Sequence, residues 1–63
     1  MKYLELIKVL HTNNTRYGDT IYIIYPDSSI SIGKYMNCDD AAIYFTDNTS
    51  VPLKDIQSVR VVK

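Results

Sequence analysis

The sequence predicts an all-β fold: a small, five-stranded, strongly bent antiparallel sheet or barrel, with a one-turn helix before the last strand. Ile, Val and Tyr are the common apolar residues, and such β-branched and aromatic side chains suit a pleated surface. Six of the seven acidic residues are aspartates, which favour turns. A chain of 63 residues has room for one hydrophobic core, so residues 1–63 form a single domain.

The opening segment, residues 3–11, fits two patterns. As a helix it would place Tyr3, Leu6 and Leu10 on one face, which is an amphipathic arrangement. As a strand its alternation breaks near Ile7, as a β-bulge would produce. We favour the bulged strand, because no N-capping residue precedes the segment and a two-turn helix would be an unusual start for a small sheet.

The middle of the chain predicts a hairpin and one further strand. Residues 20–25 are a dense run of β-formers that ends at the turn-forming residues 26–29. Residues 30–35 alternate, so they pair back on the preceding strand, and Gly33 within them indicates a bulge or a sharp bend. Residues 41–46 form the next strand after an Asx-rich loop.

The stretch after residue 50 predicts a tight turn between two strands. Pro52 cannot donate to a central ladder of hydrogen bonds, which places it at the end of a strand. Residues 53–56 are long enough for one turn of helix, which would bring Ile56 onto the core. Residues 58–62 alternate and form the final strand.

Residues 50–61, SVPLKDIQSVRV, resemble the closing segment of Src-homology-3-like and Sm-like small β-barrels. This resemblance implies a fold rather than a function. Sm-like proteins read RNA with loop residues that include a basic, glycine-bearing stretch before the last strand. The corresponding loop here, residues 47–50, is acidic and contains neither Arg nor Gly.

Charge and composition argue against several classes of partner. Seven basic residues balance seven acidic ones, so no general electrostatic attraction draws the protein to nucleic acid or to anionic membranes. The first eleven residues carry charges among their apolar side chains, so we expect neither a signal peptide nor a membrane span. Because Cys38 is the single cysteine, no disulfide forms within the chain, and we expect a soluble protein of the reducing cytoplasm.

We expect no catalytic site, no metal site and no cofactor. His11 is the only histidine, and its spacing from Cys38 suggests no nucleophile-base pair. The carboxylates of Asp39 and Asp40 disfavour a thiolate beside them, so Cys38 is expected to be an inert thiol. Asn37 and these two aspartates lack the alternating ligands, glycine and distal Glu of a calcium loop.

The tyrosines are the most informative feature for function. The chain has six tyrosines and no tryptophan. Tyr22, Tyr35 and Tyr44 lie opposite isoleucines in the predicted strands, so we expect all three to face outward. Tyrosine is enriched in protein interfaces because it combines a large apolar area with a polar tip. Cross-strand tyrosine pairs that only stiffen the sheet are the alternative.

The sequence therefore predicts a non-enzymatic protein-binding module that forms a homo-oligomer. The binding residues would be the three tyrosines together with the Asp39-Asp40 loop. The small size and the abundance of Asn, Ile, Tyr and Asp resemble bacteriophage accessory proteins, which bind a host protein and inhibit or redirect it.

Two other functional classes remain open. One is a nucleic-acid-associated regulator of Sm-like type that would use Lys54, Arg60 and Lys63. The other is a structural subunit that is stable only within an assembly.

Overall fold

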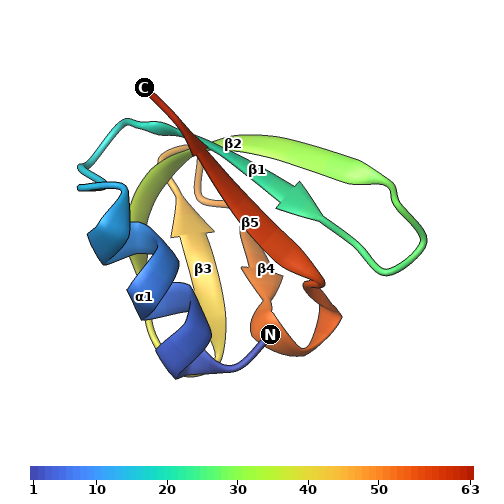
Figure 1. The fold of residues 1–63 in the computed structure, drawn as a ribbon. Coiled ribbons are helices and arrows are strands. Elements are labelled where there is room, and N and C mark those ends of the chain that lie inside the picture. The colour runs from blue at the N-terminus through green and yellow to red at the C-terminus, as the bar shows by residue number, and fades with distance from the viewer.

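The computed structural model describes all residues from 1 to 63 and confirms the all-β class, with five antiparallel strands in one sheet (Figure 1). The strand order is β4-β3-β2-β1-β5, so β4 and β5 are the two edges and the sheet is not closed. A 3-10 helix precedes the last strand, as predicted. The elements are α1 (Tyr3–Thr12), β1 (Thr20–Ile24), β2 (Ile30–Cys38), β3 (Ala42–Phe45), β4 (Ser50–Pro52), the 3-10 helix (Leu53–Asp55) and β5 (Ser58–Val62).

The prediction of a bulged strand at residues 3–11 is wrong, because this segment forms the helix α1. The helix has no side-chain cap at its N-terminus, and it is stabilised by the burial of Leu6 and Leu10 against the sheet. At its C-terminus the side chains of Asn13 and Thr15 each donate a hydrogen bond of 2.8 Å to a carbonyl of the last turn. No helix of the protein is long and apolar enough to cross a membrane.

The strand β1 lies at the centre of the β2–β1–β5 part of the sheet. Ile21 and Ile23 point from it into the core and are fully buried. Tyr22 points to the opposite face, where its cross-strand partners are Ile32 on β2 and Arg60 on β5. This register decides which side chains of the hairpin are exposed.

The strand β2 is shared between the two halves of the sheet. Its first half pairs with β1 and its second half pairs with β3. The β2–β3 ladder has a register irregularity between Tyr35 and Asn37. The sequence suggested a bulge or bend at Gly33, so the observed irregularity lies further along the strand than expected. Gly33 instead allows the ring of Phe45 to lie against the strand backbone.

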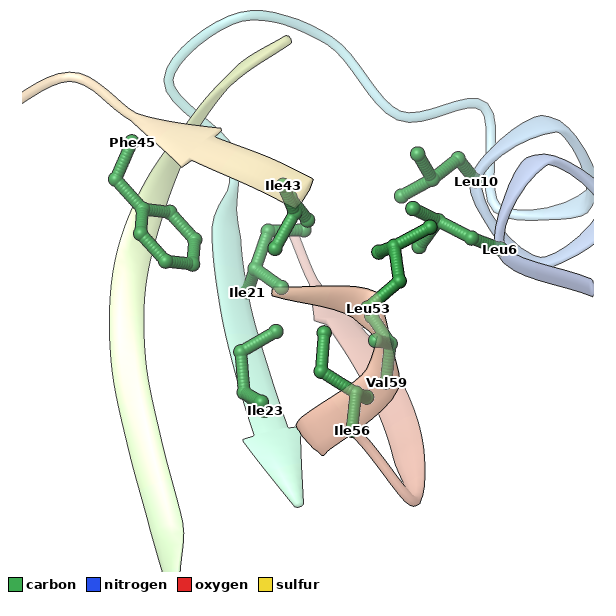
Figure 2. Packing of buried hydrophobic residues seen from close by; sticks show 9 residues of the cluster. All are labelled: Leu6, Leu10, Ile21, Ile23, Ile43, Phe45, Leu53, Ile56 and Val59. Carbon is green, nitrogen blue, oxygen red and sulfur yellow. The ribbon is translucent and has the colours of Figure 1, made fainter. Parts of the chain in front are cut away.

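One hydrophobic cluster fills the space between α1, the sheet and the 3-10 helix (Figure 2). Ile56 belongs to it, as the sequence predicts. The amino group of Met1 donates hydrogen bonds of 2.8 Å to the carbonyls of Leu53 and Ile56, which ties the start of the chain to the 3-10 helix. The nine buried residues of the cluster are Leu6, Leu10, Ile21, Ile23, Ile43, Phe45, Leu53, Ile56 and Val59.

Candidate protein-binding surface

The outer face of β2, β1 and β5 carries an exposed apolar surface around Tyr22. Ile30 is 56% exposed, Ile32 is 64% exposed and Val62 is 40% exposed. We call the outward-facing residues of these three strands the outer patch. Its members are Ile30, Ile32 and Lys34 on β2, Thr20, Tyr22 and Ile24 on β1, and Ser58, Arg60 and Val62 on β5.

The strand β2 produces this surface because it reverses the usual polarity of a half-buried strand. Its inward positions are occupied by Ser31 and Gly33, whereas Ile30 and Ile32 point outward. One face of an antiparallel sheet is commonly solvated and polar. A contiguous exposed apolar patch of this kind is a candidate interaction site when it reaches about a few hundred Å².

Sequence reasoning did not identify Ile30 and Ile32 as surface residues. The signal was present in the hairpin itself. Ile21 and Ile23 are the two buried positions of β1, and a hairpin closed by residues 25–29 sets them opposite Gly33 and Ser31. Residues directly opposite each other lie on the same face, so the isoleucines of β2 had to point outward.

The outer patch is positively charged. It contains Lys34 and Arg60 and no acidic residue. The ammonium group of Lys34 donates a hydrogen bond of 2.8 Å to the hydroxyl of Thr20. Arg60 is exposed and forms no ion pair, since the single ion pair of the protein joins Lys63 to Asp19. Arg60 is therefore available to an anionic group of a partner.

Tyr35 does not face outward as expected, because it lies on the inner side of β2 opposite Phe45 and packs against the core. Its hydroxyl donates to the Sγ atom of Cys38 at 3.7 Å. Burial and this hydrogen bond raise the pKa of Tyr35 to about 12. Cys38 is a half-buried free thiol. Tyr35 is therefore a packing residue rather than a surface residue of the predicted interface.

Tyr44 does face outward, and its hydroxyl donates a hydrogen bond of 2.8 Å to Oδ2 of Asp39. The other oxygen of Asp39 accepts hydrogen bonds from the backbone amides of Ala41 at 2.8 Å and Ala42 at 3.0 Å. The amide of Ala41, the hydroxyl of Tyr44 and the amide of Ala42 lower the pKa of Asp39. The same hydrogen bond to Asp39 raises the pKa of Tyr44. Asp39 thus organises its own loop.

The predicted binding residues are not gathered on one surface. Tyr22 belongs to the half of the sheet built from β1, β5 and the start of β2. Tyr44 lies on β3, in the other half, and the exposed Asp40 belongs to the loop before it. The aspartates of this loop form no group of three or more metal-binding side chains.

The three basic residues of the nucleic-acid hypothesis are also spread along the molecule. Lys54 lies in the 3-10 helix beside a shallow hollow that it shares with the β1–β2 turn. Arg60 lies in the middle of β5. Lys63 follows β5 and pairs with Asp19 at 2.8 Å, a hydrogen bond that lowers the pKa of that carboxyl. These cations do not converge on one phosphate-binding site.

Comparison of the chain with protein-family models, with curated proteins and with solved structures gave no match. Its function must therefore be inferred from its own surface and chemistry.

Proposed function

We propose that this protein is a non-enzymatic module that binds another protein through the outer patch. The observation that supports this proposal is the placement of Tyr22 between the exposed Ile32 and Arg60. Tyrosine and arginine are enriched among the residues that contribute most to protein interfaces. The bacteriophage resemblance implies a partner that is inhibited or redirected by binding, and this is the form of the function that we expect.

The exposed aliphatic side chains would contribute to the free energy of binding. Full burial of an isoleucine side chain contributes about 1.5–3 kcal/mol, so the half-exposed Ile30 and Ile32 would each contribute about 1–2 kcal/mol when covered. Association also costs translational, rotational and side-chain entropy. The two isoleucines together therefore favour association by about 2–4 kcal/mol, and further contacts of the interface must offset the rest of the entropy cost.

A capture experiment with matched variants tests the proposal. The protein is immobilised and exposed to extract from cells that make it, in parallel with Tyr22→Thr, Ile32→Thr and the control Tyr17→Thr. Tyr17 is 71% exposed and lies outside the outer patch. Threonine keeps the β-propensity of the two strand positions.

We expect the unaltered chain and the Tyr17 variant to capture the same partner protein. The Tyr22 and Ile32 variants should fail to capture it. Titration of the purified partner then gives its affinity. Equal recovery with all four proteins, each shown to be folded by circular dichroism, would contradict binding through the outer patch.

A nucleic-acid-associated regulator of Sm-like type is the second candidate, and the adjacency of Arg60 and Tyr22 favours it. An aromatic ring can stack on a base while a neighbouring cation contacts the phosphate. Fluorescence anisotropy with a single-stranded RNA tests it, since the affinity should fall with increasing salt. The Lys54→Ala, Arg60→Ala, Lys63→Ala triple variant should then bind more weakly.

Self-association is a further part of the proposal, and it concerns the sheet edges rather than the outer patch. The outer edges of β4 and β5 pair with no strand, and unpaired strand edges attract further strands. Pro52 limits pairing at β4, whereas β5 has five residues and no proline. Light scattering over a range of concentrations should detect a dimer or larger oligomer, and a monomer at every concentration would contradict self-association.

A further inference from the structure

We infer that the outer patch binds a short segment of a partner protein that presents aliphatic side chains bordered by carboxylates. This inference deepens the proposed protein-binding function and rests on it. The size, the charge and the side-chain chemistry of the patch each support this choice of ligand.

The size of the patch suits a short segment better than a second globular surface. It extends over three strands, which lie about 4.8 Å apart, and over five residues per strand at about 3.3 Å each. Its flat footprint is therefore roughly 200–300 Å², and the accessible surface of its protruding side chains is larger. A standard interface between two folded proteins buries about 800 Å² of accessible surface on each side. A face-to-face dimer of this chain would need contacts beyond the patch to reach that standard size.

The charge of the patch indicates acidic residues in the ligand. Lys34 and Arg60 lie on the two strands that flank Tyr22, and the patch has no acidic residue to neutralise them. A second copy packed on the patch would bring its own Lys34 and Arg60 against these cations, and juxtaposed like charges disfavour association. Carboxylates at the borders of an apolar stripe would complement them.

The aliphatic side chains favour a peptide over a nucleic acid. Ile30, Ile32 and Ile24 make up much of the apolar area, together with Tyr22 and Val62. Isoleucine has no aromatic face on which a base can stack, and contact with a phosphate does not stabilise its apolar side chain. It is stabilised when other apolar side chains remove it from water.

Two synthetic peptides of 14 residues test the inference. Both carry the same stripe of leucines at helical spacing, and the stripe is bordered by Glu in one peptide and by Lys in the other. Each is titrated into ¹⁵N-labelled protein, and the amide chemical shifts are followed by NMR. We expect the Glu-bordered peptide to shift the amides of β1, β2 and β5 around Tyr22, and to bind at least about tenfold more tightly than the Lys-bordered one, which corresponds to about 1.4 kcal/mol.

A charge swap makes the test specific. The Lys34→Glu, Arg60→Glu double variant should reverse the preference, so that the Lys-bordered peptide binds more tightly. The control is the Lys2→Glu, Lys8→Glu double variant, which changes the net charge equally at two exposed positions outside the patch. The control should keep the preference for the Glu-bordered peptide.

The possible outcomes separate this inference from the proposed function. If neither peptide shifts the patch amides, or if the two bind equally, the inferred ligand is wrong. The proposed function still stands in that case if the capture of a partner depends on Tyr22 and Ile32. If a single-stranded oligonucleotide shifts the same amides more strongly than either peptide, and no partner is captured through Tyr22 and Ile32, both the inference and the proposed function are overturned.

Discussion

A β-carbon on Gly33 would lie 2.6 Å from Cδ1 of the Phe45 ring, so the ring occupies the space that any larger residue would need. Phe45 is 4% exposed and belongs to the core cluster. The backbone angle of Gly33 is not in the left-handed region, so the glycine is required for close approach rather than for its conformation. The two residues therefore form one packing unit across β2 and β3.

Gly33→Ala should destabilise the protein by about 1–3 kcal/mol, because the methyl group forces the Phe45 ring or the strand to move. The free energy of unfolding, measured in urea, gives the loss. In a Phe45→Leu background the same change should cost less, with a coupling energy of about 0.5–3 kcal/mol in a double-mutant cycle. Additive effects of the two changes would contradict this packing relationship.

Leu6→Ala should destabilise the protein by about 2–5 kcal/mol, because Leu6 is fully buried where α1 meets the sheet. Leu4→Ala is the matched control on the same helix. Leu4 is 78% exposed, so its replacement should change the free energy of unfolding by less than about 0.5 kcal/mol. Equal effects of the two changes would mean that α1 does not depend on packing for its stability.

We expect the protein to lose stability in acid when the carboxylate of Asp39 becomes protonated. Its folded-state pKa lies below the ordinary value of 3.8, mainly because the amide of Ala41 and the hydroxyl of Tyr44 donate to the carboxylate. The resulting stabilisation is present above pH 3.8 and is lost as the pH falls through the lower folded-state value. Asp39→Asn should therefore reduce the slope of stability against pH in this range.

Urea unfolding between pH 2 and pH 5, a range chosen to span roughly the ordinary Asp pKa, measures this slope. Asp40→Asn is the control, because Asp40 accepts no hydrogen bond within the loop. It should keep the slope of the unaltered protein. An unchanged slope in the Asp39 variant would contradict the assigned role of the carboxylate.

We expect the protein to lose stability in alkali when the hydroxyl of Tyr35 ionises. Its folded-state pKa is raised to about 12 by burial and by the hydrogen bond to Cys38. The stabilisation is complete below the ordinary pKa of 10.0 and is lost as the pH rises through the folded-state value. Absorbance at the tyrosinate band should show a late titration step that Tyr35→Phe removes and that Tyr17→Phe, at an exposed position, keeps.

The elements that the sequence predicts correctly are local ones. The β1–β2 hairpin follows from a run of β-formers beside a turn, and the 3-10 helix follows from the short spacing between Pro52 and the final strand. The amphipathic pattern of residues 3–11 already placed Leu6 and Leu10 on one face of a helix, but the strand was preferred because no capping residue precedes the segment. The helix forms because these two leucines pack against distant segments, and that tertiary stabilisation outweighs the missing cap.

The prediction for Tyr35 failed for a different reason. The isoleucines of β2 were used as the reference for the inner face, and in this strand they point outward. Tyr22 and Tyr44 were placed on the outer side correctly because their own strands have buried isoleucines next to them. The face of a strand can be assigned only from its register with a neighbour, which a single strand does not specify.

The central position of β1 has a consequence for the order in which the chain folds. β1 pairs with β2 nearby in sequence, but its other neighbour, β5, lies 38 residues away at the Tyr22–Arg60 pair. The β1–β2 hairpin closes a short loop, whereas the pairing of β5 with β1 must close a much longer one, so we expect the hairpin to form first. Until β5 pairs, one edge of β1 stays open and Val59 is missing from the core, so a partly folded chain presents an unpaired strand edge to other chains.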